Sequence, residues 1–273
     1  MTHTNTPSTP YAPAAAPVVE STAIHTTADG LIEGMVRFKV DGLPVSAYRA
    51  MPQDRTNVPI VLVVQEIFGL HAYIQDTCRR LAHAGYLAVA PDLFARQGDA
   101  SQYDDVPTLM AKLVSQVPDA QVISDLDGTL AWAKVNGGDG SRVAITGFCW
   151  GGRITWLYCA QRALQAGVAW YGRLSGPTSA HALRHPVDVG ASLQTPVLGL
   201  YGGQDAGIPM ETVKAMQRVL AQGMTPAALA SNIVVYPDAP HAFHADYRPG
   251  YRREAAMDGY QRMLDWFASK GVA

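Results

Sequence analysis

The sequence predicts an α/β fold: a mostly parallel central sheet flanked by helices and preceded by an N-terminal antiparallel hairpin. Short, continuous apolar runs recur along the chain, as is typical of strands buried on both faces. Stretches with helical spacing of apolar residues alternate with these runs, and that alternation is typical of parallel sheets. The 273 residues are 48% hydrophobic and 16% charged, which is enough apolar material for a sizeable core.

The elements are expected in the following order. The hairpin joins Met35–Val40 to Pro44–Arg49 through an Asp41-Gly42 turn. The buried strands are expected at Ile60–Val64, Tyr86–Ala90, Val143–Ile145, Val168–Tyr171, Val197–Tyr201 and Ile233–Tyr236. The helices are expected at Tyr73–Ala84, Val106–Gln116, Ala120–Val135, Arg153–Ala166, Glu211–Ala221 and Arg253–Ser269.

No repeat or linker interrupts this alternation, so we expect one domain over residues 25–273. Residues 1–24 are rich in Thr, Pro and Ala and predict a disordered tail. They lack the basic start and apolar stretch of a secretory signal. No apolar run approaches the roughly 20 residues that span a bilayer. We therefore expect a cytoplasmic protein.

Composition also restricts the class of partner. The net charge of −2 gives no reason to expect nucleic acid or an anionic membrane. Three cysteines, Cys78, Cys149 and Cys159, make a disulfide framework improbable and favour a reducing compartment. A small-molecule substrate is the expected partner, and the chain is expected to be a monomer or a weak dimer.

Gly147-Phe148-Cys149-Trp150-Gly151 follows the apolar run Arg142–Thr146. Gly-x-Cys-x-Gly after a strand has the form of a nucleophile elbow, with cysteine in the usual place of serine. A nucleophile on such a turn has strained backbone angles, and the residues two positions away must lack bulk. The alternative is a core cysteine in a glycine-rich loop, because free cysteine is often buried.

Ligands of such sheets bind beyond the carboxyl ends of the strands, so the loops there are the place to look for partners of Cys149. Asp205 follows the run Val197–Tyr201, and His241 follows Ile233–Tyr236. The order nucleophile, acid, histidine is that of α/β-hydrolase triads. In that interpretation His241 is the base and Asp205 orients it. His244 is the competing base. Taken singly, Asp205 could be a turn residue and His241 a surface residue.

Glu66 comes shortly after the run Ile60–Val64. A carboxylate at the mouth of a buried strand is costly unless it has a partner or a function. The alternative is an ordinary, partly solvated loop acid.

The motifs around Cys149, Asp205, His241 and Glu66 together resemble those of the dienelactone hydrolase family, which has cysteine nucleophiles on the α/β-hydrolase fold. The resemblance runs from about Gly34 to the end of the chain. Its matching segments are Gln65–Gly69, Ala90–Arg96, Gly147–Gly152, Gly203–Asp205 and His241–Phe243.

The resemblance implies roles for these residues. Cys149 attacks a lactone or ester carbonyl to give an acyl-thioester that water hydrolyses, with no cofactor. The backbone N–H groups of Ile67 and Trp150 form the oxyanion hole. Glu66 contacts the nucleophile, and Arg96 binds a carboxylate on the substrate, which suits its bidentate fork.

The chain departs from the family pattern at one position. A second carboxylate-binding arginine stands four residues after the catalytic histidine in the family, and here that residue is Ala245. Arg248 and Arg173 are candidates to replace it, and Tyr171 is a further candidate for substrate contact. Ester hydrolysis is expected either way, whereas Ala245 leaves open whether dienelactone itself is a substrate.

Two other functions compete with this interpretation. Asp125-Leu126-Asp127-Gly128-Thr129 matches the signature of Mg²⁺-dependent phosphatases, but Val122, Leu126 and Leu130 recur at helical spacing, which predicts a solvated helix face. The second is a binding protein without catalysis, because fold does not fix function. The pairs His181/His185 and His241/His244 lack a further ligand at suitable spacing, so no metal is expected.

Overall fold

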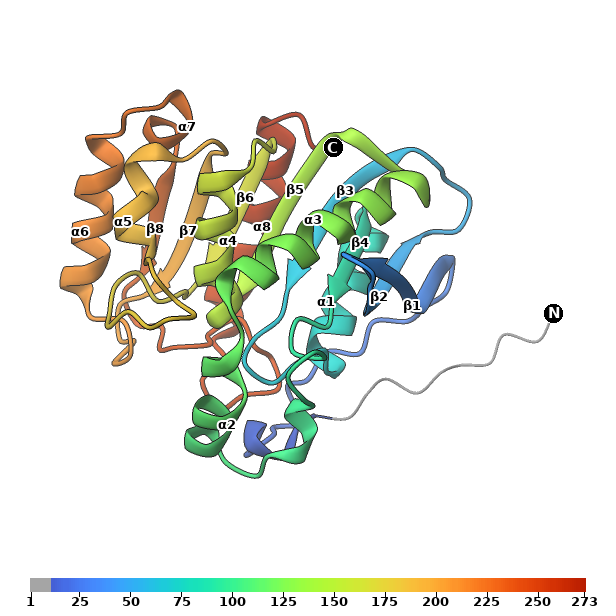
Figure 1. The fold of residues 1–273 in the computed structure, drawn as a ribbon, viewed down its shortest axis with the longest axis horizontal. Coiled ribbons are helices and arrows are strands. Elements are labelled where there is room, and N and C mark those ends of the chain that lie inside the picture. The colour runs from blue at the N-terminus through green and yellow to red at the C-terminus, as the bar shows by residue number, and fades with distance from the viewer. Residues whose placement is uncertain (1–10) are drawn as a thin grey trace.

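A computed structural model describes residues 11–273. Eight strands form one sheet in the order β1-β2-β4-β3-β5-β6-β7-β8 (Figure 1). The strands are β1 (Leu31–Val40), β2 (Leu43–Pro52), β3 (Val58–Val64), β4 (Leu87–Pro91), β5 (Gly138–Phe148), β6 (Ala166–Trp170), β7 (Val197–Gly202) and β8 (Asn232–Tyr236). β1 and β2 pair antiparallel, as do β2 and β4, and every other pair is parallel. The predicted fold class is confirmed.

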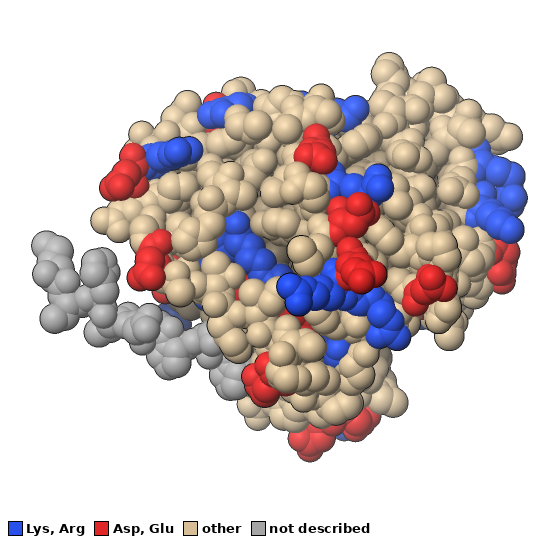
Figure 2. All heavy atoms as spheres, turned by 180° about the vertical axis from the view of Figure 1, so that it is seen from behind, with Lys and Arg blue, Asp and Glu red and all other residues tan. Residues whose placement is uncertain are grey.

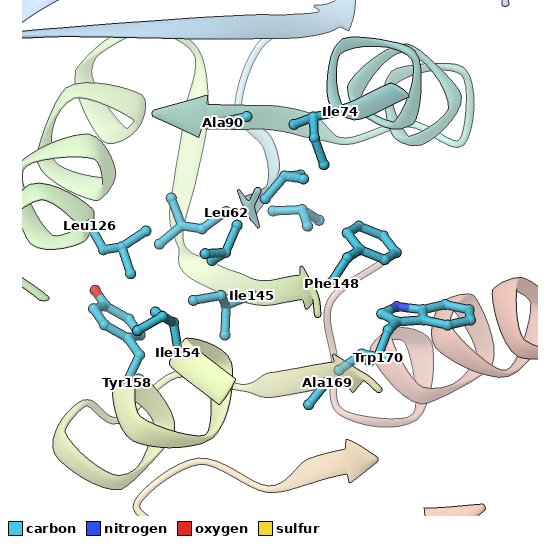
Figure 3. Packing of buried hydrophobic residues seen from close by; sticks show 14 of the residues in the cluster. Leu62, Ile74, Ala90, Leu126, Ile145, Phe148, Ile154, Tyr158, Ala169 and Trp170 are labelled. Atoms are coloured by element: carbon cyan, nitrogen blue, oxygen red, sulfur yellow. The ribbon is translucent and has the colours of Figure 1, made fainter. Parts of the chain in front are cut away.

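Helices cover both faces of the sheet (Figures 1 and 3). The long helices are α1 (Ala72–His83), α3 (Asp119–Val135), α4 (Trp150–Gln161), α6 (Met210–Ala221) and α8 (Arg253–Ser269). Shorter ones are α2 (Val106–Lys112), α5 (Pro186–Val189) and α7 (Pro226–Leu229), with 3₁₀ turns η1 (Pro13–Ala15), η2 (Ala100–Gln102), η3 (Val114–Gln116) and η4 (Gly190–Ser192). Helices α3 and α4 lie on one face of the sheet, and α1 and α8 lie on the other.

The core fills both spaces between sheet and helices. Leu126, Ile154 and Tyr158 pack from α3 and α4 toward the sheet (Figure 3). On the opposite face, Phe148 and Trp170 lie at the carboxyl ends of β5 and β6, with their rings stacked 5.6 Å apart. Every residue of β3 is buried, and accordingly its sequence is an uninterrupted run of apolar residues.

The hairpin turn is confirmed in its position and geometry. Val40 pairs with Leu43, and Asp41 and Gly42 have φ of 52° and 79°. Positive φ at both central residues defines the turn that best matches the twist of a two-residue hairpin.

Two helix boundaries differ from the prediction. The helix expected over Val106–Gln116 is interrupted at Leu113, whose φ of −122° is not helical. Helix α4 begins at Trp150 and ends at Gln161, well before the expected Ala166. The next residue, Arg162, has an extended backbone with φ of −130°, and its Nη2 lies 2.6 Å from the Asp127 Oδ2.

The expected tail is a further difference. Residues 1–10 lie outside the described residues. Residues 11–24 are placed against the sheet and its loops, with Ala12, Ala14 and Ala15 buried. Figure 1 shows this blue segment beside α2. Its small side chains allow the segment to pack closely against its neighbours. Composition alone does not reveal this packing.

The surface is mixed in charge. On the face shown in Figure 2, acidic and basic side chains lie interspersed on a mostly neutral surface. Over residues 11–273, none of the helices combines the length and apolar character needed to cross a bilayer.

Candidate active site

Cys149 lies between the end of β5 and the first residue of α4. Its φ of 54° and ψ of −115° fall in a region that non-glycine residues avoid at a cost of about 1–3 kcal/mol. Its backbone N–H donates to the carbonyl of Trp170, which ties the turn to β6. The strand, sharp turn and helix expected of a nucleophile elbow are therefore present, and the Cys149 side chain is partly exposed.

Glycines make this turn possible by allowing close backbone contacts. A Cβ on Gly147 would lie 2.2 Å from the carbonyl oxygen of Gly151, and one on Gly151 would lie 2.4 Å from that of Val64. Neither atom can move aside, because both belong to the backbone. The second contact also brings the start of α4 against the end of β3, where Glu66 and Ile67 follow.

His241 connects Cys149 to Asp205. Its Nε2 lies 3.3 Å from the Cys149 Sγ, and its Nδ1 lies 2.6 Å from the Asp205 Oδ2. The Asp205 side chain is 1% exposed, whereas that of His241 is 39% exposed. The three residues predicted from separate loops therefore form one hydrogen-bonded chain from a buried carboxylate to a partly exposed thiol.

Charge determines the protonation of His241. Desolvation favours the neutral ring, but the negative charge of a Cys149 thiolate and the hydrogen bonds to Asp205 and Cys149 outweigh it. Together they raise the pKa of His241 to about 10. The imidazole is thus protonated at neutral pH when Cys149 carries a negative charge.

The competing base, His244, lies elsewhere. It is buried against Trp170, and its Nδ1 is hydrogen-bonded to the Tyr73 hydroxyl over 2.6 Å. Burial, and secondarily the charge of Arg80, lower the pKa of His244 well below its usual value. His244 therefore stays neutral behind the site, and only His241 is bonded to Cys149.

Glu66 is buried rather than partly solvated, with 2% exposure. The Tyr247 hydroxyl donates to its Oε2 over 2.8 Å, and the His71 Nε2 lies 3.2 Å from the same oxygen. Within residues 11–273 these two are the hydrogen bonds of Glu66 and none joins it to Cys149, so the contact with the nucleophile that the family implies stays a prediction. Sequence reasoning missed His71 and Tyr247, although the polar and aromatic residues after His241 are a signal that could have pointed to Tyr247.

The expected oxyanion-hole residues are Trp150, which follows Cys149 directly, and Ile67. Trp150 is the first residue of α4, and amides in the first turn of a helix have no acceptor within that helix. Ile67 lies in the turn after β3, which the Gly151 contact holds against the start of α4.

Tyr171 is completely buried, and its ring lies 5.2 Å from the ring of His241. Burial first, then nearby acidic groups that include Glu66 and Cys149, raise its pKa. Tyr171 and Ala242 share the positive φ of Cys149, at 36° and 57°. Backbone strain is therefore concentrated in the loops around the thiol.

The predicted substrate-binding arginines have different surroundings. Arg96 forms an ion pair with Asp125, and its Nε is buried without a hydrogen-bond partner among the described residues. The Arg248 Nη1 donates to the carbonyl of Ala15 over 2.6 Å, and its guanidinium lies 5.2 Å from the centre of the Phe68 ring. Arg173 is exposed. Ala245 is buried.

The phosphatase-like segment is helical, as expected, and Asp127 is partly exposed, whereas Asp125 is buried. Asp125 lies in α3 and is 1% exposed, because Arg96 neutralises it from a neighbouring loop. Asp127 on the same helix binds Arg162 and Tyr158. No group of three or more His, Cys, Asp or Glu side chains in residues 11–273 is arranged to hold a metal ion.

Comparison with known proteins identifies the family. The family model described as "Dienelactone hydrolase family" matches residues 45–271. The chain belongs to the dienelactone hydrolase family. The part of the chain that matches includes β3, the elbow and the loops that carry Asp205 and His241.

Relatives within the dienelactone hydrolase family match almost the whole chain. A Salmonella typhimurium protein is 53% identical over 263 residues, which are 96% of each chain. A Methylorubrum extorquens protein is 54% identical over 267 residues, 97% of this chain and 90% of its own. Both carry the name "Putative carboxymethylenebutenolidase".

A crystal structure from Klebsiella pneumoniae, described as "Putative Dienelactone Hydrolase", is 55% identical. It superposes with a TM-score of 0.84 and covers 87% of this chain and 98% of its own. The fold described above is therefore also the fold of this solved protein.

Proposed function

We propose that this member of the dienelactone hydrolase family hydrolyses lactones or carboxylic esters, with Cys149 as nucleophile, His241 as proton carrier and Asp205 as its orienting acid. The observation that carries the proposal is the hydrogen-bonded chain from Asp205 through His241 to the Sγ of Cys149. A thiolate beside a protonated imidazole at the start of a helix is a competent nucleophile near neutral pH.

In the first half-reaction the Cys149 thiolate attacks the carbonyl carbon of the ester and forms a C–S bond. The C–O bond to the leaving group then breaks, and the His241 imidazolium gives its proton to the departing oxygen. The enzyme is left as an acyl-thioester with neutral His241. Asp205 keeps the ring oriented with Nε2 toward the thiol throughout.

In the second half-reaction His241 removes a proton from water as its oxygen attacks the thioester carbonyl. The C–S bond breaks, the acid product departs, and the Cys149 thiolate and the His241 imidazolium are restored. We assign the oxyanion of both intermediates to the backbone N–H groups of Ile67 and Trp150. Losing one such donor costs about 10²–10³ in rate in comparable sites.

We assign substrate recognition to Arg96, Tyr171, Arg173 and Arg248. Arg96 has a buried Nε that Asp125 does not use, which suits a carboxylate on the substrate. We further propose that Tyr171, Arg173 and Arg248 contribute to binding around the thiol. A carboxylate-bearing ester or lactone fits this set better than a purely apolar one.

The test is hydrolysis of p-nitrophenyl acetate and of dienelactone by Cys149→Ala. We expect kcat/KM to fall by about 10³-fold or more for both substrates, because the variant lacks the nucleophile. Cys159→Ala removes a buried thiol from the same helix and serves as the control, with activity close to that of the wild type. Near-normal hydrolysis by Cys149→Ala would refute the proposal.

The same assay examines Arg96 with a matched pair of esters, one neutral and one carrying a carboxylate. We expect Arg96→Ala to lower kcat/KM more for the carboxylate-bearing ester, by roughly tenfold. Asp125→Asn is the control, because it breaks the ion pair and keeps the guanidinium. Equal losses on both esters would count against a carboxylate site at Arg96.

A further inference from the structure

Residues 11–22, here called the N-terminal strap, are bonded to three consecutive residues of the loop that carries His241. The Val19 N–H donates to the carbonyl of Tyr247 over 2.8 Å, and the Thr22 hydroxyl donates to that of Asp246 over 2.5 Å. The Arg248 guanidinium donates to the carbonyl of Ala15 over 2.6 Å. The strap therefore fixes this loop at residues 246–248.

The strap also reaches the two side chains that hold Glu66. The Tyr11 ring stacks on that of Tyr247, with centroids 4.5 Å apart and an angle of 18° between the planes. It lies 5.6 Å from the ring of His71. Tyr247 and His71 are the groups bonded to the Glu66 Oε2. Tyr11 thus forms an outer layer over the residues that surround this carboxylate.

A carboxylate with 2% exposure depends on such a cover. Burial of a charged or polar group is costly unless hydrogen bonds replace water, and Tyr247 and His71 supply them here. In a water-poor environment charges act more strongly on their neighbours. A change that admits water to the Tyr247–Glu66 bond would both weaken that bond and screen the carboxylate from the thiol.

We infer that the N-terminal strap is a positioning element of the active site, which acts by holding Tyr247 and His71 on Glu66 through the ring of Tyr11. The strap lies outside residues 45–271, so the match to the family does not include it. The inference rests on the proposed function, in that it takes Cys149 as the nucleophile that Glu66 influences. Tyr11 is a positioning residue, because it touches neither Cys149 nor His241.

The test uses Tyr11→Ala and Tyr11→Phe in the full chain, with p-nitrophenyl acetate as substrate. We expect Tyr11→Ala to lower kcat about tenfold, because small displacements of active-site groups are costly in rate. Tyr11→Phe keeps the ring and is expected to restore kcat. Phe38→Ala is the matched control, because it removes a ring that stacks on Trp132 at the hairpin, 5.6 Å between centroids. It should leave kcat unchanged.

A double-mutant cycle separates positioning from a general loss of stability. If Tyr11 acts through Glu66, Tyr11→Ala added to Glu66→Gln lowers kcat no further, whereas independent effects multiply. The inference is overturned if the effects multiply, or if folded Tyr11→Ala keeps the wild-type kcat. Should Tyr11→Ala fail to fold, Tyr11→Leu replaces it with the same expected results. Loss of activity in Cys149→Ala, measured alongside, shows separately whether the proposed function holds.

Discussion

Cys149 and Cys159 occupy opposite ends of α4, and their surroundings differ. Cys149 precedes the first turn, is partly exposed and lies 3.3 Å from the His241 Nε2. Cys159 lies in the last turn, completely buried between the helix and the sheet. Burial raises the pKa of the Cys159 thiol, and likewise that of Cys78 in α1.

The two ends of α4 show that position, more than residue type, decides what a cysteine can do. The start of a helix offers unpaired N–H groups and the positive end of the dipole, which favour a thiolate. The other end offers the opposite field and, here, complete burial, which favours the neutral thiol. Cys149 also carries a strained backbone, whereas Cys159 continues a regular helix.

The largest expected contrast between the two cysteines is in alkylation by iodoacetamide. At neutral pH we expect Cys149 to react about 10³-fold faster than Cys159 or Cys78, because only thiolates react and burial keeps the other two protonated. Peptide mass spectrometry after timed labelling measures each rate. His241→Gln should slow the labelling of Cys149 alone. Comparable labelling rates at all three cysteines would contradict a reactive thiolate at Cys149 alone.

A smaller contrast is expected for the glycines that border each cysteine. A Cβ on Gly151 meets the backbone oxygens of Val64 and Gln65 at 2.4 and 2.5 Å, whereas one on Gly167 meets the Cys159 Sγ at 2.7 Å. We expect Gly151→Ala to lose most of its activity and about 3 kcal/mol or more of stability, and Gly167→Ala to lose about 1–3 kcal/mol by overpacking. Urea unfolding and ester hydrolysis measure both. The reverse order of losses would contradict the assignment of Gly151 to the elbow.

The same two regions explain what the sequence could predict. The elbow is visible because the glycines around Cys149 and the preceding strand are close in sequence, and Asp205 and His241 each follow an apolar run. The partners of Glu66 are harder to find, because His71, Tyr247 and Tyr11 meet only after three distant segments pack together. The polar and aromatic residues after His241 are the one local signal, and they point to Tyr247 alone.

The structure differs from the sequence-based expectation at two further places, and in both the cause is a contact with a distant segment. Ala12, Ala14 and Ala15 look like residues of a disordered tail, but they are buried through contacts with distant loops. Asp125 looks like a solvated residue of α3, but Arg96 enters from another loop and makes its burial tolerable. Composition and periodicity carry no information about such partners.

The most direct test of the central claim is to trap the acyl intermediate. Wild-type protein mixed with p-nitrophenyl acetate, quenched in acid during turnover and digested, should carry an acetyl group on the peptide that contains Cys149. The peptides with Cys78 and Cys159 should carry none. His241→Gln should still be acetylated, more slowly, and lose the group more slowly. Acetylation of another residue during turnover, with Cys149 unmodified while ester is hydrolysed, would contradict the account.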